Sequence, residues 1–414
     1  MTIGIYGISS QSGLTYLADF LNQGHEVIGY AHGSSHGKSV VSVINKGHGL
    51  WLERPKNTNN EETRFVSLGN SVVTHDVNLL TCADLIIVAL PSIYHVDVAR
   101  HLESIGISDK KIPFVLSPSR SFASPYIWQI LGQGYPIICL STCPYSCKIS
   151  APNRAYLKRR KRTYVASLEG KVVDAQEKLF KQLFHHAAVT RIPALTTLNN
   201  IGAVFHCATY ILNYEEIKRR EQTGESFSFY IEGIANREEV GQVLEQIDQV
   251  RLQIAAKLGL SVFGLKENPR EDIWRKLTNA LRALEEESSD DIDMLRRIRR
   301  EFTEYLNNCV VSAAHWLDLT YGVKRIEGEH LSETIGRTPT YQNNSLPQHR
   351  YVEEDIPTGL VVYEALAKRF DIDCEVISDI IDKYDKIFNC NIRLIGRNLA
   401  SFDDEFIHSY LTGK

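Results

Sequence analysis

A histidine, an arginine and an aspartate in the second half of this chain have the types needed for acid–base chemistry on anionic substrates. His206 ends an apolar run, where a lone histidine is more often a packed core residue. Arg350 and Asp355 lie in one short segment bounded by Pro357, so a cation and a carboxylate share a rigid stretch. A carboxylate paired with a histidine fixes its tautomer and stabilises the imidazolium. We therefore predict that one of the three carboxylates between Arg350 and Pro357 orients His206 across an interdomain cleft.

The first thirty residues predict the unit that would place a cofactor beside this chemistry. Residues 2–7 form an apolar strand, residues 8–13 a turn of small residues, residues 14–22 a helix and residues 26–30 a second strand. This is the opening βαβ pattern of a dinucleotide-binding fold, and the cofactor-binding candidates in its turn are Gly7, Ser9, Ser10, Gln11 and Ser12. Ser9 and Ser12 replace the usual second and third glycines, so a buried strand with an ordinary turn is the alternative.

The end of the second strand bears on which cofactor binds. NAD enzymes usually carry an acidic residue there to hold the ribose 2′-hydroxyl. This chain instead has His32, Ser34, Ser35 and Lys38, which suit a 2′-phosphate. We predict NADP(H) rather than NAD(H), the alternative being an exposed polar loop.

Three further apolar runs, at residues 84–90, 114–116 and 137–140, predict buried strands of a parallel sheet. Ligands of such sheets lie beyond the carboxyl ends of the strands, so Leu90, Pro91 and Ser117 are predicted to line the cofactor cleft. Residues 163–166 and 187–192 predict the closing strands, with a helix over 172–184 between them.

Downstream of residue 192 the periodicity is helical. We predict an α/β chain with an N-terminal Rossmann domain at residues 1–192 and a mainly helical catalytic domain at 193–414. In the second domain, Asn236 and Glu239 resemble a capping box that starts a long amphipathic helix, and Gly259 suits its end.

Composition narrows the class of protein further. The 414 residues are 43% hydrophobic and 23% charged, with a net charge of -4, which gives no general attraction to nucleic acid. No apolar run is long enough to span a bilayer, and the chain starts without a signal peptide. The basic run at 158–162 is interpreted as a solvated hairpin or edge strand, and Cys143 and Cys147 as structural thiols, without a metal site. These features predict a cytoplasmic protein.

Three segments, at residues 141–148, 200–213 and 350–359, resemble the opine dehydrogenases, a family that includes octopine, nopaline and staphylopine-type enzymes. The resemblance implies that Arg350 holds a substrate carboxylate and that Asp355 pairs with a catalytic His206. It also implies substrate contacts from Asn200 and Thr142. The family usually has proline where this chain has Cys207.

The implied reaction is NADPH-dependent reductive condensation of an amino acid, or a nicotianamine-like amine, with a 2-oxo acid such as pyruvate or 2-oxoglutarate. A metallophore product and a homodimer fit the resemblance. Two alternatives stay open: a 3-hydroxyacid or ketopantoate-type dehydrogenase, which normally uses a catalytic lysine, and a nucleotide-binding sensor without catalysis.

Overall fold

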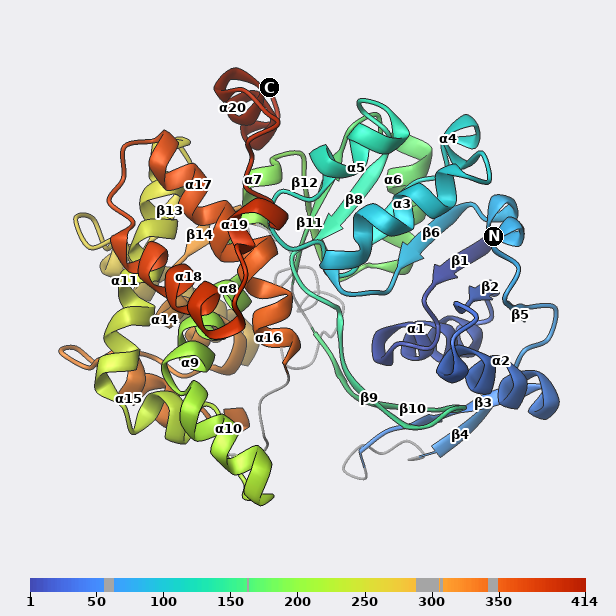
Figure 1. The fold of residues 1–414 in the computed structure, drawn as a ribbon, viewed down its shortest axis with the longest axis horizontal. Coiled ribbons are helices and arrows are strands. Elements are labelled where there is room, and N and C mark those ends of the chain that lie inside the picture. Colours follow the sequence, from blue (N-terminus) through green and yellow to red (C-terminus); the bar gives the residue numbers. More distant parts are fainter. Residues whose placement is uncertain (56–62, 162–163, 288–304, 306–307, 342–348) are drawn as a thin grey trace. The chain divides into compact units, whose positions relative to one another are not determined.

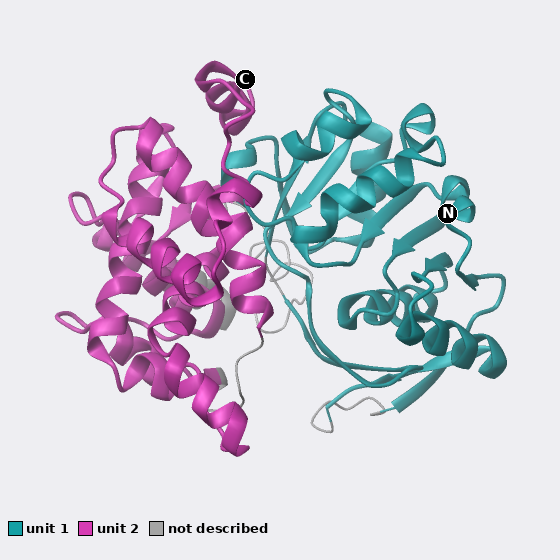
Figure 2. Ribbon diagram, in the orientation of Figure 1, with its two compact units in different colours: residues 1–196 teal, residues 197–414 magenta. Residues whose placement is uncertain are grey.

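The computed structural model describes residues 1–414 except 56–62, 162–163, 288–304, 306–307 and 342–348. The protein divides into two compact units, Met1–Thr196 and Thr197–Lys414, which Figure 2 colours separately. The division falls a few residues after the boundary expected at 192/193. Each unit has its own core and is described by itself.

Within the described residues, unit 1 is built on an eight-stranded sheet (Figure 1). In spatial order its strands are β12 (Ala187–Thr190), β11 (Tyr164–Glu169), β8 (Ile137–Leu140), β7 (Phe114–Leu116), β6 (Leu85–Val88), β1 (Thr2–Tyr6), β2 (Glu26–Tyr30) and β5 (Val72–Thr74). The neighbours from β8 to β5 run parallel, whereas β11 is antiparallel to β8. The three predicted apolar runs are β6, β7 and β8, whose carboxyl ends therefore meet at one edge of the sheet.

Helices connect the strands of unit 1 and bury their apolar sides on the sheet. They are α1 (Gln11–Asn22), α2 (Ser35–Gly47), α3 (His95–Glu103), α4 (Ile107–Lys110), α5 (Ser124–Leu131), α6 (Asp174–Leu183) and, at the end of the unit, α7 (Pro193–Leu198), with short 3₁₀ turns η1 (Val77–Cys82) and η2 (Ser92–Tyr94). Leu14 and Leu17 of α1 and Ile3 and Ile5 of β1 are fully buried, as expected for a strand covered on both faces. The predicted βαβ opening is confirmed.

A second sheet of unit 1 contains the basic run. Its order is β4 (Thr63–Ser67), β3 (Gly49–Glu53), β10 (Arg154–Arg160) and β9 (Tyr145–Ala151). The predicted hairpin is confirmed: β10 pairs with β3 only at Arg154–Tyr156, and its exposed basic residues 158–160 lie beyond that pairing, beside β9 alone. Arg160 forms an ion pair with the buried Asp19 of α1, which also accepts a hydrogen bond from Tyr145 Oη at 2.7 Å. Part of the run therefore faces protein rather than solvent; Arg162 lies outside the described residues.

Unit 2 is mainly helical. Its elements are α8 (Ile201–Phe205), α9 (Cys207–Leu212), α10 (Tyr214–Thr223), the π-helix η3 (Ile231–Ala235), α11 (Glu238–Lys257), α12 (Glu271–Glu287), α14 (Ala313–Tyr321), α15 (Leu331–Gly336), the 3₁₀ turn η4 (Pro339–Tyr341), α16 (Arg350–Glu353), the π-helix η5 (Ile356–Leu360), α17 (Val361–Arg369), α18 (Glu375–Phe388), α19 (Ile392–Ile395) and α20 (Asp404–Thr412), with a small parallel pair β13 (Val262–Phe263) and β14 (Val310–Val311). No helix among the described residues combines the length and the apolar character needed to cross a membrane.

Of the two predictions made for the ends of the long helix α11, the one for its start is wrong and the one for its end is confirmed. The predicted capping box is wrong, because Asn236 ends the preceding π-helix and α11 starts after Arg237, whose side chain makes no capping bond. Gly259 lies just beyond the helix with a φ of +73°, as its predicted place requires. Arg251 is fully buried and donates to the carbonyls of Leu198 (2.5 Å) and Val311 (2.6 Å), so α11 anchors the chain that leads into α8.

Candidate active site

Two glycines make the tight turn between β1 and α1 possible. Gly7 has a φ of +98°, a conformation that side chains disfavour. A Cβ on Gly13 would lie 2.1 Å from the carbonyl oxygen of Gly7, so only glycine lets the helix approach the strand this closely. The expectation placed this third-glycine role at Ser12; the structure assigns it to Gly13, one residue later.

The geometry of this turn fits a dinucleotide pyrophosphate. Ser10 is the N-cap of α1: its Oγ accepts from the Gly13 amide at 2.9 Å and donates to the Ala89 carbonyl at 2.5 Å. The amides of Gln11 and Ser12 lie in the first turn, where an α-helix offers them no acceptor of its own. Free amides at the start of the helix can donate to a phosphate, and the absence of side chains at the two glycines leaves the phosphate room to approach them. Contacts of Ser9, Gln11 and Ser12 with a cofactor stay predictions.

The predicted 2′-phosphate residues gather at the start of α2. Ser34 is the N-cap of this helix and its Oγ accepts from the Gly37 amide at 3.1 Å. His32, Ser34, Ser35 and Lys38 are all exposed, so an anion could reach them. His36, which the sequence reading did not single out, places its Nε2 3.0 Å from the Ser9 carbonyl and so links this helix to the pyrophosphate turn.

The residues predicted at the strand ends differ in exposure. Leu90 and Pro91 are half-buried, and the Leu90 side chain lies where a Cβ on Gly7 would clash at 2.8 Å. Ser117 is nearly fully buried and its Oγ lies 2.7 Å from Tyr16 Oη. This bond favours a structural role for Ser117, whose predicted cofactor contact is untested. Thr142 follows β8, and its Oγ1 accepts from Lys161 Nζ at 2.5 Å.

The structure brings His206 and Asp355 together. His206 Nδ1 lies 2.7 Å from Asp355 Oδ2; the carboxylate side chain is fully buried and the imidazole is 16% exposed. An ionised carboxylate accepts only, so Nδ1 carries the proton and Nε2 is left as the basic atom. Both residues belong to unit 2, so the pair is internal to that unit and does not span two domains as predicted.

A close helix contact explains why residues so far apart in sequence meet. His206 lies between α8 and α9, and Asp355 directly precedes the π-helix η5. A Cβ on Gly359 of η5 would stand 2.7 Å from Ala203 Cβ of α8, so glycine lets the two helices touch. Cys207 is the first residue of α9, a position that also tolerates the proline usual in the family.

Two aromatic residues that sequence reasoning missed complete the surroundings of the histidine. Tyr351 stacks on the imidazole, with ring centroids 4.1 Å apart and an interplanar angle of 11°. Tyr230 Oη lies 3.2 Å from His206 Nε2. Burial raises the pKa of Tyr230 well above its usual range, so its hydroxyl stays protonated and donates to the basic Nε2. Tyr351 lies in the segment 350–359 that carries the resemblance but was not singled out there, and Tyr230 lies in none of the three segments.

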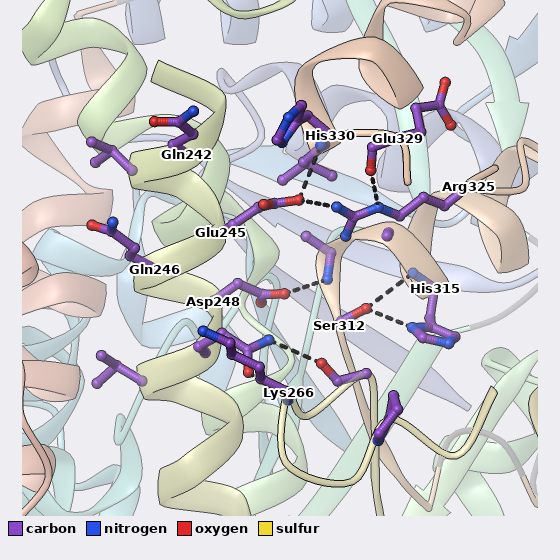
Figure 3. Close-up of a pocket in the computed structure, with 18 of the residues that line it drawn as sticks. Gln242, Glu245, Gln246, Asp248, Lys266, Ser312, His315, Arg325, Glu329 and His330 are labelled. Carbon is purple, nitrogen blue, oxygen red and sulfur yellow. Dashed lines mark hydrogen bonds and ion pairs between the residues drawn. The ribbon is translucent and has the colours of Figure 1, made fainter. Parts of the chain in front are cut away.

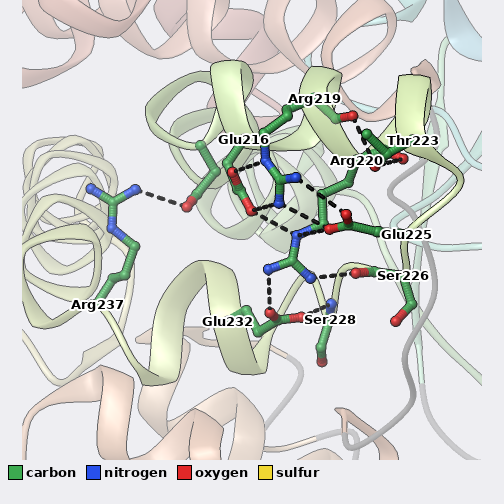
Figure 4. A network of polar contacts seen from close by, with 10 residues as sticks. Glu216, Arg219, Arg220, Thr223, Glu225, Ser226, Ser228, Glu232 and Arg237 are labelled. Carbon is green, nitrogen blue, oxygen red and sulfur yellow. Dashed lines mark hydrogen bonds and ion pairs between the residues drawn. The ribbon is translucent and has the colours of Figure 1, made fainter.

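Polar contacts hold Tyr230 in place. It directly precedes the π-helix η3, and π-helical turns often mark functional sites. Glu232 of η3 pairs with Arg220 of α10 at 2.9 Å, within the network of Figure 4. Asn213 donates to the Gly233 carbonyl at 3.0 Å and accepts from Arg237 at 2.8 Å. These bonds hold the π-helix that directly follows the tyrosine.

The other two predicted substrate residues of unit 2 have different settings. Arg350 opens α16 and is exposed, and no described residue forms an ion pair with it. The alternative local pairs with Glu353 and Glu354 are therefore not formed. Asn200 is almost fully buried, and its Nδ2 lies 3.1 Å from where a Cβ on Gly359 would stand. Its setting favours positioning α8 over touching substrate.

A cavity of about 1480 Å³ in unit 2 is lined by none of these residues (Figure 3). It runs along α11, and its polar groups are bonded to one another. Asp248 accepts from the Ala313 amide at 2.7 Å, Arg325 pairs with Glu245 at 2.6 Å, and Ser312 Oγ lies 2.6 Å from His315 Nδ1. The candidate site around His206 is separate from it.

Known proteins share both units of this architecture. The family model for the alpha-helical domain of NAD/NADP octopine/nopaline dehydrogenase matches residues 194–388. The chain is 22% identical over 338 residues to an opine dehydrogenase of Arthrobacter sp. (strain 1C), covering 79% of this chain and 77% of that protein. Octopine dehydrogenase with NADH and L-arginine has a similar structure, with a TM-score of 0.68, 16% identity and coverage of 100% and 98% of the two chains. Yersinopine dehydrogenase with NADP⁺ gives a TM-score of 0.59 at 14% identity, covering 100% and 97%.

A dinucleotide-type sheet followed by a helical unit defines a dehydrogenase fold, as these structures share it. The helical unit carries the similarity to this family, because the family model spans most of that unit and includes His206 and Asp355. The similarity to opine dehydrogenases indicates an NAD(P)-dependent oxidoreductase. The family resemblance and the fold class inferred from the sequence are confirmed.

Proposed function

We propose that this protein catalyses the NADPH-dependent reductive condensation of an amino acid with a 2-oxo acid. The observation that carries the proposal is the 2.7 Å pair of His206 and Asp355 inside a unit that matches the opine dehydrogenase model. The amine and the carbonyl form an imine and release water, and reduction of the imine carbon leaves a secondary amine between two carboxylates. Bound NADPH would supply the hydride for that reduction.

The residues of unit 2 would move and hold protons in this reaction. His206 Nε2 accepts a proton from the substrate ammonium, which frees the amine to attack the carbonyl. Asp355 stabilises the imidazolium that results and keeps Nε2 as the reacting atom. Tyr230, bonded to the same nitrogen, orients the ring and donates when Nε2 is basic. Arg350 is exposed and without an ion pair among the described residues, so it can grip a substrate carboxylate.

The direct test is NADPH oxidation by the purified protein with a panel of amino acids against several 2-oxo acids. The solved relatives name L-arginine, agmatine and pyruvate as ligands, which makes these three the first members of the panel. A nicotianamine-like amine tests whether the product is a metallophore. Oxidation that requires an amine and an oxo acid together supports condensation; oxidation with the oxo acid alone would instead favour a ketopantoate-type reductase. No oxidation with any pair, while NADPH binds, would favour a sensor.

Two smaller parts of the proposal concern the assembled protein. The expected homodimer is tested by light scattering on the eluting peak of a size-exclusion column. The expected cytoplasmic location is tested by fractionating cells that express the tagged chain.

The cofactor preference depends on Lys38. Its exposed ammonium at the start of α2 can contact a 2′-phosphate that NADH lacks. We expect Lys38→Gln to weaken NADPH binding by roughly ten- to a hundredfold, because one charge-assisted bond is lost, and to leave NADH binding nearly unchanged. Titration of each cofactor, followed by its fluorescence, measures both constants. Lys46→Gln, at the other end of the same helix, is the matched control; an equal loss for both cofactors would exclude discrimination by Lys38.

The role of Arg350 separates a substrate ligand from a structural residue. A planar guanidinium grips a carboxylate with two parallel bonds, which a lysine cannot reproduce. We expect Arg350→Lys to raise KM for one substrate by roughly ten- to a hundredfold, with little change for the other substrate, for NADPH affinity or for the melting temperature. Kinetics that vary each substrate in turn, with a thermal melt, measure this. Arg275→Lys, an exposed arginine of α12, is the control. A lower melting temperature with equal effects on both substrates would indicate a structural arginine.

A further inference from the structure

Lys161, within the basic run of unit 1, lies against the segment that follows β8 rather than pointing freely into solvent. Its backbone amide donates to the Pro144 carbonyl at 2.7 Å, which brings the end of the β9–β10 hairpin against the segment that follows β8. Its side chain is half-buried and its Nζ donates to Thr142 Oγ1 at 2.5 Å. The ammonium therefore lies at the carboxyl end of β8, the edge of the sheet where ligands of this fold bind.

The charges around Lys161 do not balance. No carboxylate among the described residues lies within ion-pair distance of its Nζ. Burial, above all, lowers the pKa of Lys161 to about 8, and the nearby guanidinium groups of Arg159 and Arg120 act in the same direction, whereas Cys143 and Cys147 act in the opposite direction. Removing part of a cation's hydration without supplying a counter-ion costs free energy, and an anionic ligand would offset that cost.

The polar groups of this cluster match a carboxylate. The ammonium donates one N–H to Thr142, and its other N–H groups remain available to a ligand. The Thr142 hydroxyl accepts from Lys161, so its own hydrogen is available for donation to an oxygen. Arg120 has a φ of +59° in the loop after β7, a strained conformation for a residue with a side chain. Strain of this kind tends to persist at ligand sites, where the surrounding structure enforces it.

We propose that Lys161, with Thr142 and Arg120, forms a second carboxylate site, which binds whichever of the two substrates Arg350 does not hold. This inference rests on the proposed function, because reductive condensation brings two carboxylates to one enzyme and a single arginine serves only one of them well. It assigns one anion site to each unit of the chain: Lys161 in unit 1 and Arg350 in unit 2.

The same positive charge could serve a phosphate of the cofactor, so the occupant has to be distinguished. The turn that fits the pyrophosphate follows β1, which is separated from β8 by β6 and β7 in the sheet. Three strand spacings of about 4.8 Å separate the ends of β1 and β8 by roughly 14 Å. The cluster is thus displaced along the sheet from the turn that fits a pyrophosphate, which favours a substrate carboxylate.

Kinetics of three variants test the site. We expect Lys161→Gln to raise KM for one substrate by roughly ten- to a hundredfold, with a smaller change in kcat and unchanged NADPH affinity. The substrate affected should be the one that Arg350→Lys spares. Lys161→Arg keeps the charge and should recover most of the loss, and Lys158→Gln, an exposed lysine of the same hairpin, should behave as wild type. A fall in NADPH affinity would assign the lysine to the cofactor, and an effect on the same substrate as Arg350 would overturn the division between the two units.

A pH profile provides a readout that a purely structural lysine would not move. The ammonium is protonated below its pKa of about 8, so the affected KM should be low below this pH and rise above it. In Lys161→Arg the guanidinium stays charged, so this rise should disappear. This comparison also decides the case in which Lys161→Gln fails to fold. The same rise in both proteins would overturn the proposal.

A binding experiment separates this inference from the proposed reaction. Calorimetry would titrate the protein with bound NADP⁺ using oxamate, an unreactive isostere of pyruvate, and separately L-arginine. If the wild type oxidises no NADPH with any substrate pair, yet binding of one probe weakens in Lys161→Gln, the condensation is wrong and the anion site stands. If no KM and no probe affinity depends on Lys161, the anion site is wrong, whatever the reaction proves to be.

Discussion

Replacing His206 with alanine is expected to lower kcat by about 10²–10⁴-fold while NADPH still binds. The imidazole carries the basic atom of the pair, because Asp355 lies 2.7 Å from its Nδ1 and leaves Nε2, to which Tyr230 donates, as the proton acceptor. Its loss removes the group that accepts a proton from the substrate ammonium and later donates that proton back during the reaction. Binding of NADPH should survive, because the turn that fits the pyrophosphate lies in unit 1 and His206 in unit 2.

Stopped-flow measurement of single-turnover NADPH oxidation reports the chemical step, and fluorescence titration reports cofactor affinity. His408→Ala removes an exposed histidine of the same unit and should leave both unchanged. A His206→Ala protein that turns over within a few-fold of wild type would show that proton transfer does not depend on this residue, and the pair would then be a packing feature of the helical unit.

Replacing Asp355 with asparagine should also cost about 10²–10⁴ in kcat, by analogy with the loss of the orienting aspartate from a catalytic triad. The amide has nearly the same shape, so the packing around this buried side chain is kept. However, it can donate to Nδ1, which favours the tautomer with hydrogen on Nε2 and removes the basic atom. It also no longer stabilises the imidazolium.

The matched control for this substitution is Glu353→Gln, an exposed carboxylate two positions away. A thermal melt tests whether Asp355→Asn folds as wild type, because the aspartate side chain is fully buried. If the variant is as stable as wild type and as active, the carboxylate neither fixes the tautomer nor supports charge on the histidine. If it is inactive and also unstable, the His206→Ala result alone tests the pair.

Several parts of the architecture follow from local sequence. The strand, turn and helix at the start of the chain were predicted because an apolar strand, small turn residues and a helical apolar period each act within a few residues. The same holds for β6, β7 and β8, whose continuous apolar runs reflect burial on both faces of a sheet. Even so, the local pattern misplaced one role: Gly13 permits the close helix approach because a Cβ there would lie 2.1 Å from the Gly7 carbonyl oxygen, and spacing alone does not reveal that clash.

The segments at 200–213 and 350–359 contain His206 and Asp355, the two members of the candidate pair, but their meeting depends on tertiary packing. His206 and Asp355 are 149 residues apart and are joined because Gly359 lets η5 touch Ala203 of α8. Tyr230 reaches the same imidazole from a third segment and carries no motif. Local sequence cannot report such contacts, because they depend on how separate helices pack.

The basic run at 158–162 shows most clearly which properties follow from sequence and which from the tertiary structure. By itself the sequence determined that charge was concentrated there and that a hairpin would carry it. Only the tertiary structure decided where each charge points: Arg160 toward buried Asp19, and Lys161 toward Thr142 without a carboxylate partner among the described residues. The physical reason is that residue type fixes the charge of a side chain, whereas desolvation and the choice of partner are properties of the folded neighbourhood.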